Sequence, residues 1–238
     1  MEQNIIIRVA DSGDVHYAKT ITDEMESSAK ARGTGIARRS PEYIANKMEE
    51  GKAVIAHTQN GAWVGFCYIE TWGHNEYVAN SGLVVAPEFR KSGVAKAIKK
   101  KIFDISRERY PNAKIFGLTT GLAVMKINSE LGYEPVTYSE LTQDEAFWAG
   151  CKSCVNYDIL MSKERKNCLC TAMLYDPKDH YTPEETKESF EKKSKVFERL
   201  LQLKQLSFLK AFKKKDNNGN NGTGAAKPVT FFHHFFNL

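Results

Sequence analysis

The segment Val84-Val-Ala-Pro-Glu-Phe-Arg-Lys-Ser-Gly-Val-Ala95 could bind a phosphate group. It joins the end of an apolar run to the start of a long amphipathic stretch, and Gly93 and Ala95 keep the turn and the first helical turn slim. The first amides of a helix lack internal acceptors, and the helix dipole favours negative charge at that end. The spacing therefore predicts a pyrophosphate cradle, although an ordinary helix start after a proline turn fits the same residues.

The elements around this segment follow from hydrophobic periodicity and from turn residues. Asn60-Gly61 separates two strand-like runs, and this pair of residues favours a tight hairpin. The predicted order is a strand at 5–9, helices at 15–29 and 40–50, an antiparallel meander of strands at 52–58, 62–71 and 77–85, a helix at 92–109, a strand at 114–120, a helix at 124–131, and strands at 133–138 and 169–175.

This order, with Arg90, Gly93 and Ala95 matching the pattern Gln/Arg-x-x-Gly-x-Gly/Ala, resembles the GNAT superfamily of N-acetyltransferases. The resemblance implies an α/β (α+β) GNAT fold, whose mixed, mostly antiparallel sheet splays at the acyl-CoA site and is flanked by helices. Residues 1–177 would form this domain, with a cysteine-containing insertion at about 141–168. A C-terminal helical extension is predicted for 178–215 and a flexible tail for 216–238, where few apolar groups offset the ordering entropy.

The same resemblance implies acetyl-CoA or another acyl-CoA as cofactor. The pantetheine arm would pair with the backbone of 83–85 as though it were another strand, and the Val84 N–H would polarise the thioester carbonyl. Asn128 stands where many members carry a tyrosine general acid. Because an amide can donate a hydrogen bond to sulfur but supplies no proton, the leaving thiolate would be protonated by water or by another residue. The predicted cofactor contacts are Leu83, Val84, Val85, Arg90, Lys91, Ser92, Gly93, Val94, Ala95, Lys96 and Asn128.

The acceptor amine needs a base and a specificity pocket. Glu70, at the end of a predicted strand, is the candidate base, directly or through water; a solvated strand-end carboxylate is the alternative. Arginine binds carboxylates bidentately, so a loop containing three arginines predicts an acidic substrate, whereas a solvated basic loop is the plain interpretation. The loop residues are Arg32, Thr34, Arg38 and Arg39.

The segments 29–43, 65–70, 79–83 and 119–177 resemble bacterial stand-alone acyltransferases linked to arginine biosynthesis. That resemblance implies N-acylation of glutamate or a close relative. Acylation of a protein lysine or N-terminus, and a non-catalytic acyl-CoA sensor or interaction module, are the competing hypotheses. Substrate does not follow from fold.

Four cysteines form two close pairs, Cys151-x-x-Cys154 and Cys168-x-Cys170. Four thiolates in two knuckles can hold a structural zinc ion tetrahedrally, which would leave no open catalytic position. Free thiols and a catalytic thiol are the alternatives.

Composition excludes other classes of protein. The net charge of +5 reflects basic residues late in the chain and gives no reason to expect nucleic-acid binding. No run of eighteen apolar residues and no basic signal-peptide flank occur, so we expect a cytoplasmic protein without a membrane partner. A small-molecule amine is the expected partner, and a homodimer is compatible with the sequence.

Overall fold

Seven strands form one mixed sheet in the order β1-β2-β3-β4-β5-β7-β6. The computed structural model describes residues 4–33 and 36–180, which belong to one compact unit. The strands are β1 (Ile5–Val9), β2 (Ala53–Thr58), β3 (Trp63–Trp72), β4 (Tyr77–Val85), β5 (Lys114–Thr119), β6 (Glu134–Val136) and β7 (Thr171–Tyr175). The helices are η1 (Ser12–Tyr17), α1 (Ala18–Ala31), α2 (Pro41–Glu49), η2 (Pro87–Phe89), α3 (Val94–Arg109), α4 (Leu122–Glu130), η3 (Tyr138–Glu140), α5 (Glu145–Ala149), η4 (Gly150–Ser153) and α6 (Tyr157–Ser162).

The predicted element order is confirmed, with shifts of a few residues at element ends. α3 begins at Val94 rather than at residue 92, because Gly93 adopts a left-handed φ of +86° that a helix interior excludes. The strand expected over 133–138 shortens to β6, because Thr137 and Glu140 form a capping box that starts η3. Thr34, the tail at 216–238 and nearly all of the predicted helical extension lie outside the described residues.

Strands β2 to β4 form the predicted antiparallel meander, β1 pairs antiparallel with β2, and β4 runs parallel to β5. That parallel pairing has three residue pairs, the last joining Ala79 to Phe116. Beyond it the two strands continue without pairing. We call the space between 80–85 of β4 and 117–119 of β5 the fork. The predicted splay of the sheet is thereby confirmed.

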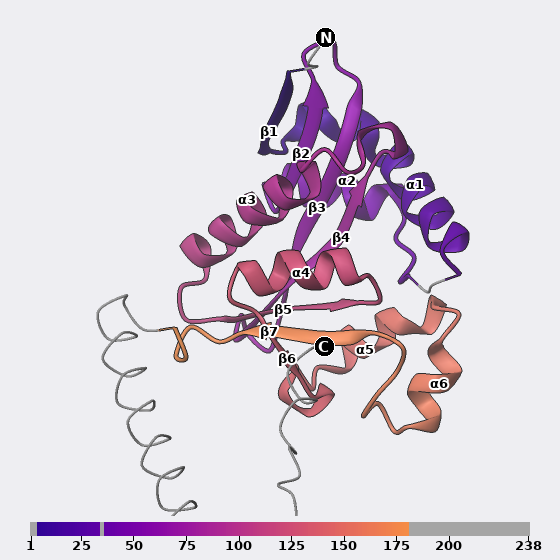
Figure 1. Cartoon of the computed structure of the whole chain (residues 1–238), viewed down its shortest axis with the longest axis vertical. Helices are drawn as coiled ribbons and strands as arrows, with labels where there is room; N and C mark the ends of the chain where they lie inside the picture. Colours follow the sequence, from indigo (N-terminus) through magenta and orange to yellow (C-terminus); the bar gives the residue numbers. More distant parts are fainter. Residues whose placement is uncertain (1–3, 34–35, 181–238) are drawn as a thin grey trace, which may run out of the picture. The chain divides into compact units, whose positions relative to one another are not determined.

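Alternate side chains of each strand enter different cores, as the two-residue period of a strand requires. On β3, Cys67 and Ile69 pack in the core that contains the α3 residues Ile98 and Ile102. Tyr68 packs in a second core with apolar residues of α1 and α2. α3 therefore covers one face of the meander while α1 and α2 cover the other, as Figure 1 shows.

The insertion between β6 and β7 folds into α5, η4 and α6. It packs an aromatic cluster against β5 and β7, in which Trp148 is 3% exposed and contacts Tyr138 and Phe147. The Trp148 indole N–H donates to the Thr142 carbonyl at 2.9 Å, so its polar atom is satisfied inside the cluster. The insertion is therefore a packed part of the domain.

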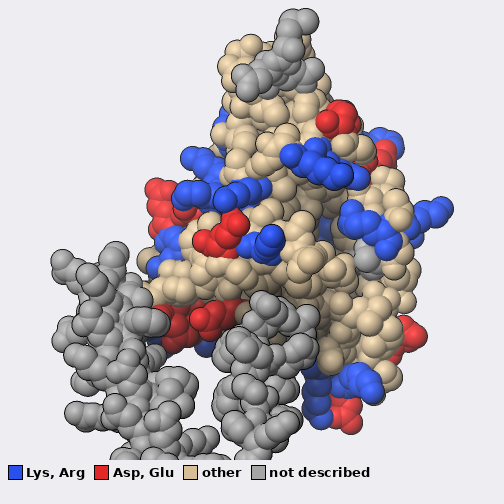
Figure 2. All heavy atoms as spheres, viewed as in Figure 1, with Lys and Arg blue, Asp and Glu red and all other residues tan. Residues whose placement is uncertain are grey.

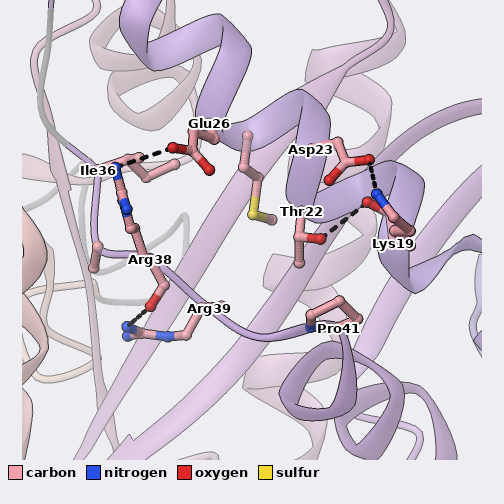
Figure 3. A pocket seen from close by; sticks show the side chains of 10 residues that line it. Lys19, Thr22, Asp23, Glu26, Ile36, Arg38, Arg39 and Pro41 are labelled. Atoms are coloured by element: carbon pink, nitrogen blue, oxygen red, sulfur yellow. Dashed lines mark hydrogen bonds and ion pairs between the residues drawn. The ribbon is translucent and has the colours of Figure 1, made fainter.

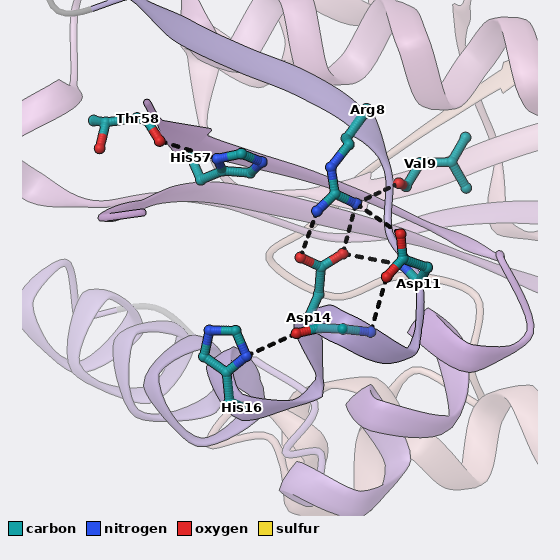
Figure 4. A network of polar contacts seen from close by, with 8 residues as sticks. Arg8, Val9, Asp11, Asp14, His16, His57 and Thr58 are labelled. Atoms are coloured by element: carbon teal, nitrogen blue, oxygen red, sulfur yellow. Dashed lines mark hydrogen bonds and ion pairs between the residues drawn. The ribbon is translucent and has the colours of Figure 1, made fainter. Parts of the chain in front are cut away.

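A partly buried ion pair joins η1 to β1 (Figure 4). Arg8 binds the Asp14 carboxylate bidentately, at 2.7 and 2.8 Å, and Asp14 also accepts the Asp11 N–H at 3.0 Å. Burial raises the pKa of Asp14, but the hydrogen bonds from Arg8 and Asp11 outweigh it, so the pKa falls below its ordinary value. Asp11 and Asp14 also form a capping box at the start of η1.

No helix within residues 4–33 and 36–180 has the length and apolar character that crossing a bilayer requires.

Candidate active site

A β-bulge shapes the β4 side of the fork. The register pairs Phe66 with Val84 but Tyr68 with Ser81, so β4 carries one extra residue there. Gly82 has φ +65°, and a Cβ on it would lie 2.4 Å from a ring carbon of Tyr68. Only glycine fits this position, both for its backbone conformation and for the close approach of Tyr68.

The hydrogen bonds between β3 and β4 determine which backbone amides of β4 point toward the fork. The Ala86 N–H donates to the Val64 carbonyl of β3 at 2.9 Å. Because the backbone groups of successive strand residues point to opposite sides, the amide of Val84 is directed toward β3, like that of Ala86. The amides of Leu83 and Val85 are then directed toward the fork.

Asn128 of α4 lies beside the other arm of the fork. Its side chain is 1% exposed, and its Nδ2 contacts the Met173 sulfur at 3.8 Å. A Cβ built on Gly117 would lie 3.9 Å both from that Nδ2 and from the Asn80 carbonyl oxygen. Within the described residues the Asn128 Oδ1 has no hydrogen-bond partner. A buried amide with an unpaired end is costly unless a ligand completes its hydrogen bonds.

The helix start after β4 has the geometry of an anion site. Gly93 is the N-cap of α3 and no side chain caps the first turn. The place where a Cβ of Gly93 would project is open for 4 Å. The Ser92 hydroxyl donates to the Phe89 carbonyl at 2.6 Å, which braces the turn below the helix start. The amides of Val94 and Ala95 are therefore available to an incoming anion.

Two of the predicted phosphate-binding cations have other partners. Arg90 donates to Glu24 at 2.6 Å, to Ser28 at 2.7 Å and to the Val85 carbonyl at 3.1 Å, which ties the loop to α1. Lys96 forms an ion pair with Glu130 of α4 at 2.8 Å. Positive charge nevertheless gathers over α3, as Figure 2 shows. The groups with which this helix start could bind an anion are thus chiefly its backbone amides.

Glu70 lies in a buried network with residues from α2 and from the loop before it. Its Oε1 accepts the Tyr43 hydroxyl at 2.5 Å and an Arg39 Nη2–H at 3.2 Å, and the carboxylate is 4% exposed. Arg39 also donates through Nε to the Tyr68 hydroxyl at 3.1 Å and through Nη1 to the Arg38 carbonyl at 3.2 Å. Among the described residues, three of the five guanidinium N–H groups are thereby used, which leaves two for a ligand.

The network fixes the charges of its members. Burial and the neighbouring Glu70 charge both raise the pKa of Tyr43, so this phenol stays protonated and donates. Burial lowers the pKa of Arg39, but Tyr68, Glu70 and Tyr43 outweigh it and the pKa rises. Arg39 and Glu70 therefore form a buried ion pair rather than two independent side chains.

A cavity of about 230 Å³ lies beside this network, between α1 and the loop that leads to α2 (Figure 3). Its lining residues are Lys19, Thr22, Asp23, Met25, Glu26, Ile36, Ala37, Arg38, Arg39 and Pro41. Met25 also approaches the Gly82 bulge, so the cavity lies next to the β4 side of the fork.

The predicted substrate-binding arginines differ in position. Arg38 and Arg39 both line the cavity, whereas Arg32 is exposed at the end of α1 and does not. Arg38 pairs with Glu26 at 3.0 Å, and both side chains are largely exposed. Each arginine of the cavity thus already has a carboxylate partner, which sequence spacing alone did not indicate.

Sequence analysis missed the two tyrosines of the network. Tyr68 precedes Glu70 by two residues, so the strand period places both on one face. Tyr43 stands where a capping box would carry an acid, and its backbone N–H is capped by Ser40 at 3.1 Å. These two positions were the available signals.

The four paired cysteines gather at the insertion. The Tyr138 hydroxyl lies 2.8 Å from the Cys168 sulfur, and the Cys170 N–H donates to that sulfur at 3.3 Å. Burial and the nearby thiols raise the pKa of Cys151 to about 11. All five cysteines of the chain are free. Within 4–33 and 36–180 no group of three or more His, Cys, Asp or Glu side chains is arranged to hold a metal ion. The zinc site at Cys151, Cys154, Cys168 and Cys170 stays a prediction, and metal analysis of reduced protein tests it.

Lys99 of α3 is a buried cation without a carboxylate partner among the described residues. It is 2% exposed, and its ammonium lies 5.1 Å from the centre of the Tyr133 ring. Burial lowers the pKa of Lys99 to about 8. Tyr133 in turn donates to Asn80 at 3.0 Å, so this polar cluster lies beneath the closed end of the fork.

Comparison with known proteins agrees with this geometry. Residues 23–125 match the family model described as "Acetyltransferase (GNAT) family". This segment includes Glu70, the β4 bulge, the α3 N-terminus and the first turn of α4. A comparison with curated protein sequences gave no significant match.

Solved structures share the fold at low sequence identity. N-acetylglutamate synthase from Neisseria gonorrhoeae, in complex with coenzyme A and N-acetyl-glutamate, superposes with a TM-score of 0.52 at 19% identity. The match covers 76% of this chain but only 36% of that enzyme, so the chain spans about a third of the synthase. The Mycobacterium tuberculosis protein Rv2747, in complex with CoA, gives a TM-score of 0.52 at 16% identity over 72% of this chain and 98% of its own.

The fold is therefore the α/β GNAT fold, with a seven-stranded mixed sheet flanked by helices. Residues 23–125 thus match the GNAT acetyltransferase family model, and the described residues share the fold of N-acetylglutamate synthase.

Proposed function

We propose that this chain transfers an acyl group from acyl-CoA to the amino group of a small, acidic amino acid, glutamate or a close relative. The observation that carries the proposal is the buried network of Arg39, Glu70, Tyr43 and Tyr68 beside the cavity. It offers a carboxylate to take a proton and two unused guanidinium N–H groups to bind a carboxylate.

The cofactor would extend from α3 into the fork. Its pyrophosphate would bind the amides that follow Gly93, and its pantetheine arm would pair with the fork-facing amides of Leu83 and Val85. The alternation of β4 favours Leu83 over Val84 as the amide that polarises the thioester carbonyl. Asn128 would donate a hydrogen bond to the departing sulfur, since its side chain is buried at the fork with an unpaired end. The terminal amide O and N are interchangeable by a flip, so either can face the ligand.

Glu70 would act as the base through Oε2, directly or through water. Both observed hydrogen bonds go to Oε1, so the second oxygen is the one available to the amine. The neutral amine attacks the thioester carbon and gives an N–H proton to Glu70, directly or through water, as the C–S bond breaks and the amide forms. CoA leaves as the thiolate, which takes a proton from solvent.

A second acceptor class is favoured by the acidic residues of the cavity. Asp23 and Glu26 line it, paired with Lys19 at 2.6 Å and with Arg38 at 3.0 Å. A cationic side chain, as in a lysine residue of a protein, could take the place of those internal partners. The two acceptor classes differ in charge and are therefore separable by a simple panel.

A thiol-release assay with acetyl-CoA and succinyl-CoA against glutamate, glutamine, lysine and a lysine peptide tests the proposal. We expect glutamate to give the highest kcat/KM, because a neutral side chain leaves buried guanidinium N–H groups unpaired. Equal rates for glutamate and glutamine would overturn the acidic acceptor. Tight acyl-CoA binding without release of CoA for any amine would identify a sensor instead of an enzyme.

A further inference from the structure

The insertion is bonded directly to the loop that carries the cavity arginines. The Arg38 backbone N–H donates to the Ser153 hydroxyl oxygen at 2.9 Å, although the two residues are 115 positions apart. The Ser153 hydroxyl in turn lies 3.5 Å from the Gly150 carbonyl oxygen. A hydrogen bond therefore links η4 to the segment that leads into α2.

Gly150 lies against the guanidinium of Arg39. A Cβ at position 150 would lie 3.4 Å from Arg39 Nη2 and 3.6 Å from Nη1. The backbone at Gly150 has φ −60°, an ordinary helical value, so its conformation does not require glycine. The room that glycine leaves is filled by Arg39, and any larger side chain would compete with the guanidinium for that space.

The next residue extends the same contact. Cys151 is half-buried, and the charge of Arg39 acts on its thiol against the effects of burial and of the other cysteines. Arg39 is thus enclosed by η4 on one side and by Tyr43, Tyr68 and Glu70 on the other. Its side chain is 17% exposed.

We propose that η4, Gly150–Ser153, is an acceptor wall: a specificity-determining segment that sets the position of Arg39 and so the size and charge of the amine that reaches Glu70. This inference rests on the proposed function and adds a determinant from the insertion, which lies outside the matched family segment of 23–125. It takes an amine whose carboxylate can reach the two unused N–H groups of Arg39. Gly150 sets the available room, and Ser153 is a positioning residue that acts through the Arg38 backbone.

The test compares four single variants by acceptor binding and by turnover. Gly150→Val inserts a branched side chain toward Arg39, whereas Gly150→Ala adds only the Cβ and serves as its matched control. Ser153→Ala removes the bond to the loop. Ser162→Ala is the control for that change, because within the described part of the chain the exposed Ser162 hydroxyl bonds only to the Ile159 carbonyl of its own helix.

We expect Gly150→Val to raise the acceptor KM at least about tenfold, since displacing Arg39 weakens a charged hydrogen bond. The KM for acyl-CoA should stay within about twofold. Ser153→Ala should raise the acceptor KM about threefold. Gly150→Val and Ser153→Ala should both lower the ratio of kcat/KM for glutamate to that for glutamine. Gly150→Ala and Ser162→Ala should behave as the parent protein does.

Calorimetric titration of the acceptor into the protein saturated with CoA separates the two proposals, because it needs no turnover. Acceptor binding without CoA release in the parent protein would contradict the proposed function and leave the wall intact if Gly150→Val weakens that binding. Turnover in the parent together with unchanged acceptor KM and preference in both folded variants would overturn the wall alone. A parent protein that binds none of the amines contradicts both.

Discussion

The proposed cofactor end and the proposed acceptor end of this domain offer different kinds of groups to their ligands. At the cofactor end, the available groups are backbone amides, set by the β4 bulge at Gly82 and by the left-handed Gly93. At the acceptor end they are side chains, Arg39 and Glu70, which are buried and bonded to each other before any ligand arrives. A backbone site depends on where glycine stands, whereas a side-chain site depends on contacts between distant segments. Mutations at the cofactor end should therefore chiefly weaken cofactor binding, whereas mutations at the acceptor end should also change the stability of the fold.

The largest effect should follow from placing a charge in the backbone cradle. Gly93→Glu should weaken acyl-CoA binding about a thousandfold, because the new carboxylate fills the open space and repels the phosphates at the same amides. Gly93→Gln carries the same backbone strain without the charge and is the control. Calorimetry with CoA measures both, and equal affinity for the two variants would contradict the anion site.

The next effect concerns stability at the acceptor end. Glu70→Leu should destabilise the fold by about 3 kcal/mol, because Arg39 is left as a buried charge without its partner. The double variant Arg39→Met/Glu70→Leu should recover part of that loss while remaining inactive. Urea unfolding followed by circular dichroism gives the two free energies. A double variant no more stable than Glu70→Leu would show that the ion pair is not the cause.

Removing the Lys99 charge should have the opposite effect on the free energy of unfolding. Its pKa falls from 10.5 to about 8 on folding, so at pH 7 the native state holds a charge that burial disfavours. A shift of this size corresponds to about 3 kcal/mol, an upper value for the gain on removing the charge. Lys99→Met should therefore stabilise the protein at pH 7.

The pH dependence follows from the same shift. The unfolded state binds more protons than the native state between pH 8 and 10.5, so the contribution of Lys99 to stability rises with pH across that window. The parent protein should approach the stability of Lys99→Met as the pH rises through it. Equal stability of parent and variant at pH 7 would contradict a buried ammonium.

The smallest effect should separate function from stability at one residue. Asn128→Leu removes a buried acceptor that lacks a partner, so the free energy of unfolding should rise by about 1 kcal/mol. The kcat should fall about tenfold, because the departing sulfur loses a hydrogen bond. Thermal unfolding and CoA release measure the two. A variant that is less stable and fully active would overturn the assignment.

The same contrast explains what could be predicted from the sequence. The helix start at Gly93 and the strand that precedes it are local features, so their residues could be identified by spacing. Arg90 could not be placed, because its bonds to Glu24 and Ser28 join segments more than sixty residues apart. The role of Tyr43 depends on Glu70 in the same way, through a contact between α2 and β3.

The insertion contains a contact that hydrophobic periodicity could not predict. Its place between the last two strands was predicted correctly. Its cysteines predicted a metal site, and nothing in the sequence pointed to Gly150. A glycine with an ordinary φ carries no local signal. Its proposed role rests on a contact with a distant residue, since a Cβ on it would lie 3.4 Å from Arg39, and sequence spacing does not indicate that contact.

The three residue pairs that join β4 to β5 have a consequence for the dynamics of the domain. A short parallel ladder with an open end is a place where local opening costs little free energy, so amides near it should exchange with solvent readily. A pantetheine arm that bonds to Leu83 and Val85 would lengthen that ladder by ligand rather than by protein. Hydrogen–deuterium exchange should then slow at residues 80–85 and 117–119 when CoA is added, and much less at β1 and β2. Cofactor binding would thus stabilise the junction between β4 and β5 and hold the two halves of the sheet together during the reaction.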